Sequence, residues 1–367
     1  MRIGVLTLNL NYNYGGILQA YALCQVLKGM GHSTLLIQRK KNYSVVQWLR
    51  KIIGMFLNKD TMLLSSLLCG DIATFVEKHI PERTRPLSRK ELFTICEKEQ
   101  LDAIIVGSDQ IWRNWDKRIV KSSFLDFCYD KHNLIRIAYA ASFGNANWQY
   151  NSEDTLFIKK HLSKFRALSV REVSGISLCN QYLHLDVKLV LDPTLLLEPV
   201  RYESILGNKT NSCSVDSIAV YVLDDAKWKE EIVSNISSIL NLNEQRLTPP
   251  QKERLLNVFF SYSKCKWSAV EHWLSCIKDS HFVVTDSYHG TIFSILFRKP
   301  FVVLENEQRG ASRIESILEL LNLEDRLLKN GNTLLNTVNK PIDWSNVEKN
   351  LKEWRIKSIS FLENSLN

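Results

Sequence analysis

The sequence predicts an α/β protein made of two doubly wound, Rossmann-like domains that face each other across a cleft. Short apolar runs rich in β-forming residues alternate with helix-length amphipathic segments along most of the 367 residues. Each run stops at a polar residue or a glycine, as expected where buried parallel strands open onto a shared rim. The length corresponds to about two domains of 150–200 residues each.

The first domain is expected to span residues 1–200. It opens with a strand at 3–8, a polar loop at 9–16, a helix at 17–28 and a second strand at 34–37, which together form a βαβ unit. The later elements continue the alternation, with strands at 102–106, 136–141, 167–170 and 188–191 and a helix at 152–165.

An apolar segment at 43–80 interrupts the alternation. Its hydrophobic residues recur at helical spacing, which predicts an insertion of two helices. The basic residues that flank these helices are Arg50, Lys51 and Lys59. Two roles are open for this insertion. It could pack against the first domain, or it could rest on an anionic membrane face beside a lipid-linked ligand.

The second domain is expected to span residues 215–340 and repeats the pattern. Its elements are strands at 217–223, 281–285 and 301–304, and helices at 226–240, 268–278, 291–297 and 312–321. Ser268 and Glu271 have the spacing of a capping box at the start of one helix. The last segment, 341–367, predicts a helix that packs back toward the first domain.

Composition excludes several classes of protein. The net charge of +8 suggests an anionic ligand, but the basic residues are scattered and no basic face alternates with aromatic residues, so no nucleic-acid partner is expected. The eight cysteines contain no Cys-x-x-Cys pair, and we interpret them as free, buried thiols in a reducing compartment. The acidic and histidine residues show no metal-binding spacing, so neither a metal nor a cofactor is expected.

The expected location is the cytoplasm, with the inner face of the membrane as the possible contact of 43–80. The apolar run that follows Met1 is too short for a signal peptide. No segment approaches the roughly 18 apolar residues that span a bilayer.

The first candidate site segment is the loop that follows the first strand, Asn13-Tyr14-Gly15-Gly16, together with Gln19. Two adjacent glycines let the backbone approach a ligand, and the start of a helix offers free N–H groups to an anion. The glycine spacing of dinucleotide binders and the Lys-Ser/Thr of a P-loop are absent. The alternative is a turn that needs glycine only for its shape.

Several other strand ends carry polar side chains. Asp109, in Gly107-Ser108-Asp109-Gln110-Ile111-Trp112, could orient or deprotonate a hydroxyl, or could cap a helix. Arg171 suits bidentate capture of a carboxylate or phosphate, or could pair with Glu172. Other strand-end residues expected on the rim are Ser108, Trp112, Ser142 and Asp192.

The most informative segment is Thr285-Asp286-Ser287-Tyr288-His289-Gly290-Thr291. His289 is expected just before a helix, beside the positive end of the helix dipole, where an imidazole can donate a proton close to an anion. A buried structural histidine is the alternative. Arg313 is expected at the start of a later helix, pointing either into the cleft or to the surface.

These motifs, in this order, resemble the polysaccharide pyruvyl transferase family over about residues 1–325. The resemblance implies a two-domain fold like that of the B-type glycosyltransferases. It also implies phosphoenolpyruvate as the donor, with no metal or nucleotide. The product implied is a pyruvate ketal on a sugar of a surface polysaccharide or its lipid-linked precursor.

The resemblance also assigns roles to residues. The family's loop histidine falls on His289, the expected proton donor, and its strand-end arginine falls on Arg171, which with Gly290 and Thr291 would bind the donor. Asp109 is our own candidate for orienting or deprotonating the acceptor hydroxyl. The chain departs from the family at Ser287, where many members carry arginine. Residues that could bind the donor in its place are Ser287 itself, Arg313 and Arg309. The residues assigned to the acceptor or to the surrounding loops are Asn13, Tyr14, Gly15, Gly16, Gln19, Ser108, Trp112, Ser142, Asp192 and Asp286.

Two other functions stay open at this point. A sugar-nucleotide glycosyltransferase of the same architecture would use the same cleft, with its diphosphate at a helix terminus of the second domain. A non-catalytic glycan-binding subunit would explain Ser287 as the mark of a decayed site.

Overall fold

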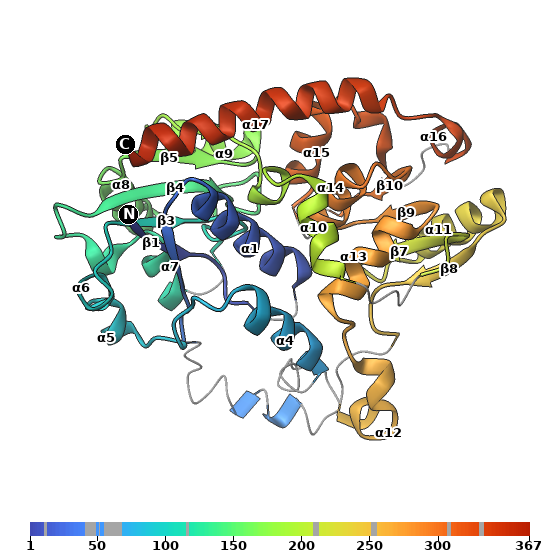
Figure 1. Ribbon diagram of the computed structural model, residues 1–367, viewed down its shortest axis with the longest axis horizontal. Coiled ribbons are helices and arrows are strands. Elements are labelled where there is room, and N and C mark those ends of the chain that lie inside the picture. Colours follow the sequence, from blue (N-terminus) through green and yellow to red (C-terminus); the bar gives the residue numbers. More distant parts are fainter. Residues whose placement is uncertain are drawn as a thin grey trace.

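The computed structural model describes residues 1–10, 13–40, 49–50, 52–54, 68–114, 117–207, 213–250, 255–306, 310–329 and 334–367. Two α/β units lie side by side, each built on a parallel sheet with helices around it (Figure 1). The first sheet has six strands in the order β2-β1-β3-β4-β5-β6, and the second has five in the order β11-β10-β9-β7-β8. The α/β class expected from the sequence is confirmed.

The strands of the first unit form where the sequence predicts them. They are β1 (Arg2–Leu6), β2 (Ser33–Ile37), β3 (Ala103–Val106), β4 (Ile135–Ala141), β5 (Ala167–Val170) and β6 (Lys188–Leu189). The helices are α1 (Tyr14–Gly29), α4 (Gly70–His79), α5 (Arg89–Leu92), α6 (Ile95–Lys98), α7 (Lys117–Ser123), α8 (Ser152–Leu162) and α9 (Val173–Leu178). Shorter helical turns are Asp126–Cys128, Cys179–Leu183 and Pro193–Leu195.

The second unit follows the connecting helix α10 (Pro199–Leu206). Its strands are β7 (Ser217–Tyr221), β8 (Asn243–Arg246), β9 (Phe282–Thr285), β10 (Phe301–Leu304) and β11 (Leu327–Leu328). The helices that follow α10 are α11 (Lys227–Leu240), α12 (Leu255–Cys265), α13 (Val270–Asp279), α14 (Tyr288–Leu296), α15 (Ala311–Leu320), α16 (Leu334–Asn339) and α17 (Trp344–Leu366), and a 3-10 turn lies at Glu324–Arg326.

Two details of the second unit differ from the prediction. Strand β8 was not expected, because its sequence Asn-Glu-Gln-Arg is wholly polar; it forms at the sheet edge, paired with β7 alone. The predicted capping box at Ser268 is wrong: α13 begins at Val270 and Ala269 caps it without a side-chain bond. The backbone carbonyl of Ser268 instead accepts a hydrogen bond from the hydroxyl of Tyr14, 2.9 Å away.

A single hydrophobic core joins the two units. One face of the first sheet, with residues such as Ile3 and Ile105, belongs to the same buried cluster as Trp273 of α13 and Phe293 of α14. The other face of that sheet has a separate cluster around Trp112. Because the shared cluster runs across the seam, the packing that stabilises each unit also holds the units together.

The predicted insertion at 43–80 lies largely outside the described residues, which omit 41–48, 51 and 55–67. Its described C-terminal part includes α4, whose Ile72 and Phe75 are buried. The ring centroids of Phe75 and Tyr21 are 6.4 Å apart, so α4 packs against α1. Membrane contact through this segment stays a prediction. Among the described helices, none combines the length and apolarity that a membrane span requires.

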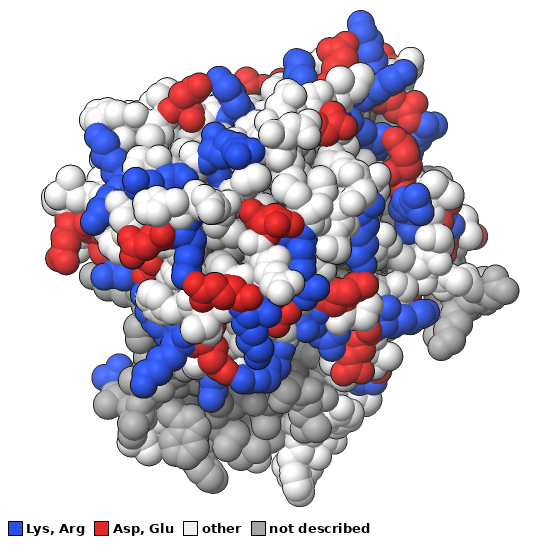
Figure 2. Space-filling model, turned by 60° about the vertical axis from the view of Figure 1, so that its left-hand side comes forward, with Lys and Arg blue, Asp and Glu red and all other residues white. Residues whose placement is uncertain are grey.

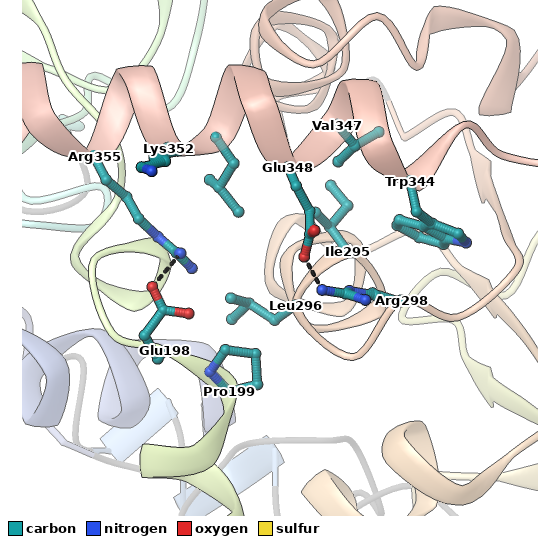
Figure 3. Close-up of a pocket in the computed structure, with 11 residues that line it drawn as sticks. Glu198, Pro199, Ile295, Leu296, Arg298, Trp344, Val347, Glu348, Lys352 and Arg355 are labelled. Atoms are coloured by element: carbon teal, nitrogen blue, oxygen red, sulfur yellow. Dashed lines mark hydrogen bonds and ion pairs between the residues drawn. The ribbon is translucent and has the colours of Figure 1, made fainter.

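Helix α17 crosses from the second unit onto the first (Figure 1). The hydroxyl of Ser358 accepts a hydrogen bond from the amide of Leu191, 2.9 Å away. Beneath α17, a cavity of about 320 Å³ opens toward α10 and α14, and ion pairs of Arg355 with Glu198 and of Arg298 with Glu348 lie at it (Figure 3). The chain therefore passes between the units at two places, α10 and α17.

The cysteines differ in part from the prediction. Six are buried and outside any disulfide, as expected, but Cys213 and Cys276 form a disulfide. No local pattern points to this pair, because 63 residues separate the two cysteines. On the face drawn in Figure 2, basic and acidic side chains are interspersed, in keeping with the scattered charge of the sequence.

Candidate functional site

The candidate site lies where the first turns of α1 and α14 meet between the two sheets. Gly15 of α1 packs directly on the ring of His289: a Cβ built on Gly15 would lie 1.9 Å from the His289 Nδ1. Because no side chain fits in that space, only glycine allows this approach. The strand ends of β3 and β5 bring Asp109 and Arg171 to the same place.

Helix α1 begins earlier than predicted. Asn13 caps it, its Oδ1 accepting a hydrogen bond from the amide of Gly16 over 3.2 Å. Gly15 and Gly16 are therefore the first turn of the helix rather than a loop, and neither has a positive φ. The alternative interpretation, in which a turn needs these glycines for its shape, is therefore wrong. Position 15 requires glycine because the backbone there packs directly against the ring of His289.

Arg171 lies between two carboxylates. Its two terminal nitrogens donate to Asp109 Oδ1 over 2.9 Å and to Asp192 Oδ2 over 2.6 Å. Its Nε is 3.9 Å from Glu172 Oε2, which is too long for a hydrogen bond. All four side chains are 3% exposed or less. Arg171 is therefore compensated by carboxylates of the protein itself, and binding of the donor by Arg171 stays a prediction.

Asp192 is the most constrained carboxylate of the cluster. Its Oδ2 accepts from Ser108 Oγ over 3.0 Å as well as from Arg171. Its Oδ1 accepts from the amide and the hydroxyl of Thr194 over 3.0 and 2.7 Å. Burial disfavours the charged form of Asp192, but the charge of Arg171 and the hydrogen bonds from Thr194 favour it, and the pKa of Asp192 is lowered. The pKa of Asp109 is also lowered: burial alone would raise it, and the charge of Arg171 is the main effect that lowers it.

His289 lies inside the first turn of α14 rather than just before it, because the helix begins at Tyr288 and not at Thr291 as predicted. Its Nε2 is 3.8 Å from Asp192 Oδ2, and among the described residues it has no hydrogen-bond partner. Burial lowers the pKa of His289 to about 4, and Asp192 opposes this shift without cancelling it. The imidazole is therefore neutral at pH 7, with one ring nitrogen uncommitted inside a buried, charged cluster.

A second arginine, Arg313, approaches the cluster from the first turn of α15. It is 5% exposed, so its interpretation as a surface residue is wrong. Arg313 Cζ is 5.6 Å from the ring centroid of Tyr288, and Arg171 Cζ is 4.5 Å from the same ring. Burial and the charge of Arg171 lower the pKa of Arg313 to about 10, so both guanidinium groups stay charged at neutral pH.

The loop after β4 completes the seam. A Cβ on Gly310, which precedes α15, would lie 2.5 Å from the carbonyl oxygen of Gly144. Ser142 Oγ accepts from the amide of Gly144 over 2.9 Å. Burial raises the pKa of Glu172, so this carboxyl is the one most easily protonated in the cluster. Sequence reasoning gave Glu172 only as a partner for Arg171.

Three predicted site residues make contacts that position other parts of the protein. Gln19 accepts from the amide of Ser108 over 3.0 Å and donates to Thr7 Oγ1 over 2.8 Å, which ties α1 to the loop after β3. Tyr14 stacks on Trp273 with centroids 5.2 Å apart, across the seam. Trp112 is buried and donates to the carbonyl of Ser123 in the first unit.

Three residues of the loop after β9 have hydrogen-bond partners within the second unit. Asp286 accepts from Lys229 Nζ and Asn306 Nδ2, each over 2.8 Å, and is therefore a brace within the second unit. Ser287 caps α14, and its hydroxyl is the acceptor for the amide of Gly290 over 3.5 Å. The amide and hydroxyl of Thr291 both donate to the carbonyl of Ser287. These groups have partners within their own helix, and binding of the donor at Gly290 and Thr291 stays a prediction.

Sequence reasoning missed two contributors. Lys229, which is 1% exposed, lies in the first turn of α11, where nothing in the sequence distinguishes it from a surface lysine. Tyr288 lies within the predicted motif and could have been selected from its position beside His289. Arg309, the other candidate substitute for the family arginine, lies outside the described residues.

A cavity of about 520 Å³ opens at the carboxyl ends of β1 and β2, the edge of a parallel sheet at which ligands bind. It is lined by Asn9, Leu10, Gln38, Arg39, Lys40, Arg85, Pro86, Ser88 and Glu91. Arg39 donates to the carbonyl of Thr7 over 3.1 Å, and the Thr7 hydroxyl donates to the carbonyl of Ser108 over 3.3 Å. Thr7 thereby connects the cavity wall to the cluster.

Solved structures resemble this chain in fold. A UDP-GlcNAc 2-epimerase from Methanocaldococcus jannaschii matches with a TM-score of 0.56 at 14% identity, covering 98% of this chain and 99% of that one. The Neisseria meningitidis UDP-GlcNAc 2-epimerase bound to UDP-GlcNAc matches with a TM-score of 0.52 at 9% identity, covering 100% and 99%. MnaA of S. aureus with UDP matches with a TM-score of 0.51 at 11% identity, covering 96% and 87%. These neighbours show that the fold is glycosyltransferase-B-like.

Sequence comparison identifies the family. No curated protein matches the chain. The family model for polysaccharide pyruvyl transferase matches residues 13–308, a stretch that contains Gly15, Asp109, Arg171, Asp192 and His289 and ends just before Arg313. This match covers well over half of the chain, and the protein belongs to the polysaccharide pyruvyl transferase family, a family of enzymes.

Proposed function

We propose that this enzyme transfers the three-carbon unit of phosphoenolpyruvate to a sugar of a surface polysaccharide or its lipid-linked precursor, forming a pyruvate ketal. The observation that carries the proposal is the uncommitted Nε2 of His289, buried at the seam beside Arg171 and Arg313. A dianionic donor needs cations and a proton-transferring group together, and this cluster offers both.

The reaction balances without a further reactant. A proton adds to the methylene carbon of phosphoenolpyruvate, which leaves positive charge on the adjacent carbon. One sugar hydroxyl attacks that carbon and loses its proton, and inorganic phosphate leaves. A second hydroxyl then closes the ring, so that one donor and one diol give one ketal and one phosphate.

His289 is the proposed proton carrier. Alone it is neutral at pH 7, because burial lowers its pKa to about 4. A bound phosphate and carboxylate place negative charge beside the ring, which raises the pKa and favours the imidazolium. The proton that His289 takes up with the donor is then available for the methylene carbon. Asp109, kept ionised by Arg171, is proposed to orient the attacking hydroxyl.

Arg313 is proposed to bind the donor phosphate in place of the family arginine. It is buried within reach of the same ring as Arg171, and repulsion between the two guanidinium groups favours an anion between or beside them. The acceptor sugar is proposed to enter the cavity at the ends of β1 and β2, whose 520 Å³ lies within the range of small-ligand sites.

A phosphate-release assay tests the proposal. Phosphoenolpyruvate is supplied with a panel of galactose- and mannose-type acceptors, free and lipid-linked, and the product is examined for a ketal. His289→Gln should lower turnover by about 10²–10⁴, whereas His281→Gln, at an exposed position of the same unit, should not.

Two results would overturn the proposal. Turnover with a sugar nucleotide and none with phosphoenolpyruvate would identify a glycosyltransferase of the same fold. Oligosaccharide binding without turnover of any donor would identify a glycan-binding subunit.

A further inference from the structure

A cluster of two cysteines and one histidine lies on the second unit, separate from the His289 site. Cys213 precedes β7, and His272 and Cys276 lie on α13. His272 and Cys276 are four residues apart, so they share one face of that helix. The ligand atoms of all three side chains lie within 4.8 Å of one another.

The immediate contacts show how closely these groups meet. The Sγ of Cys276 is 3.4 Å from the Nε2 of His272 and is bonded to the sulfur of Cys213. Both cysteines are buried, at 2% and 1% exposure, whereas His272 is half-buried and reaches solvent. Gln245 approaches the same sulfur, its Nε2 3.6 Å away. Two sulfurs and an imidazole nitrogen are the donor set that zinc prefers in proteins.

We propose that reduction of the Cys213–Cys276 bond turns this cluster into a zinc site. A dithiol reductant supplies two electrons and two protons and becomes a disulfide itself, which leaves two cysteine thiols. Zn²⁺ then displaces both thiol protons and is bound by two thiolates and the neutral imidazole of His272.

The distances allow one ion to reach all three groups. Zinc binds sulfur at about 2.3 Å and imidazole nitrogen at about 2.0–2.1 Å. Three donor atoms that already lie within 4.8 Å of one another can surround one such ion after small side-chain rotations. Among the described residues no further cysteine, histidine or carboxylate joins this group. A water molecule on the exposed side of His272 is therefore the fourth ligand.

The site would connect two parts of the molecule. Cys213 lies at the end of the segment that leads from α10 into β7, and Cys276 lies on the helix whose Trp273 stacks against Tyr14 of the first unit. Either the disulfide or the zinc ion ties the connecting segment to the helix at the seam. The two forms differ in what breaks them, since a reductant opens the first and a chelator opens the second.

Cobalt binding tests this proposal on the full-length chain. The protein is titrated with Co²⁺ without reductant, and again anaerobically after treatment with dithiothreitol and its removal. The reduced chain should show a thiolate-to-cobalt charge-transfer band that saturates at one ion per chain and that zinc abolishes, and the oxidised chain should show none. Absence of the band from the reduced chain overturns the proposal.

Variants locate the ion. Cys213→Ser or Cys276→Ser should abolish the saturable band. Loss of a residue that only contacts a metal ligand lowers metal affinity by about 10–100-fold. Because His272 is proposed as a direct ligand, His272→Ala should lower cobalt affinity by more than that. Cys24→Ser and His281→Ala, outside the cluster, should bind as the wild type does. Should a serine variant fail to fold, by circular dichroism, the half-exposed His272 still decides: unchanged affinity in His272→Ala overturns the site.

Discussion

Replacing Gly15 by alanine is the sharpest test of the seam between α1 and α14. The new methyl carbon would lie 1.9 Å from Nδ1 and 2.1 Å from Cγ of His289. An ordinary contact begins at 3.4 Å, so the ring or the helix must move by about 1.5 Å, the difference between these two distances. Neither neighbour can give easily, because His289 and the first turn of α1 are both buried.

The magnitude follows from that displacement. Overpacking a buried contact costs about 1–3 kcal/mol. A misplacement of about 1 Å at a reacting group can lower turnover by about 10²-fold. We therefore expect Gly15→Ala to reduce kcat for phosphate release by about 10²-fold or more while the chain stays folded.

The assay compares kcat, KM and thermal unfolding for Gly15→Ala with those for Gly29→Ala. Gly29 ends the same helix, and a Cβ built there meets nothing within 4 Å. The control should keep its activity and, with less freedom in the unfolded chain, gain about 0.4–1 kcal/mol. Wild-type kcat in Gly15→Ala would refute the close packing of glycine and imidazole from which the site is built.

Three further predictions concern charge. His289→Gln should flatten the pH dependence of the free energy of unfolding. In the wild type this free energy should fall by about 3 kcal/mol between pH 6.5 and pH 4, because the unfolded chain takes up a proton that the buried ring excludes. Urea unfolding of both proteins at both pH values measures the difference. Identical pH dependence in the two proteins would contradict the lowered pKa. Asp192→Asn should destabilise by about 3–5 kcal/mol in urea unfolding, since it leaves a buried guanidinium short of a counter-charge, whereas Asp186→Asn at an exposed pair should change little. Lys229→Met should likewise lower the free energy of unfolding by about 3–5 kcal/mol, whereas Lys227→Met, at an exposed ion pair, should change it little. A small loss in Lys229→Met would show that the stability of the second sheet does not depend on the ion pair with Asp286.

The sequence predicted the sheets well because buried parallel strands carry a strong local signal. Ala103–Val106 and Phe301–Leu304 are uninterrupted apolar runs, and each forms a fully buried strand. Strand β8 shows the limit: an edge strand is held by backbone pairing to β7, which its polar side chains do not encode.

The site was predicted by residue type more successfully than by role. Asp109, Arg171, Asp192, His289 and Gly15 were all selected as strand-end or loop residues, and the fold brings them together. Their partners could not be predicted, because pairing across the seam depends on how two separate sheets meet.

The loop after β9 shows the same limit from the other side. Asp286 and Ser287 stand in the same motif as His289, yet one braces a lysine and the other caps a helix. A motif predicts where a segment lies in the fold. Which of its side chains face the seam depends on the rotation of the helix about its axis and on distant partners such as Lys229.

Because α17 packs on the first unit, the folding of that unit is completed only by residues that are synthesised after the whole second unit. Phe361 lies against Tyr139 of β4, with ring centroids 6.2 Å apart, and Leu362 and Leu366 are buried in the shared core. A ribosome has released the whole first sheet long before these residues emerge from its exit tunnel. The N-terminal half of a nascent chain therefore keeps part of its apolar surface uncovered until α17 has been translated, and a chain cut short before α17 would present that surface to chaperones and proteases.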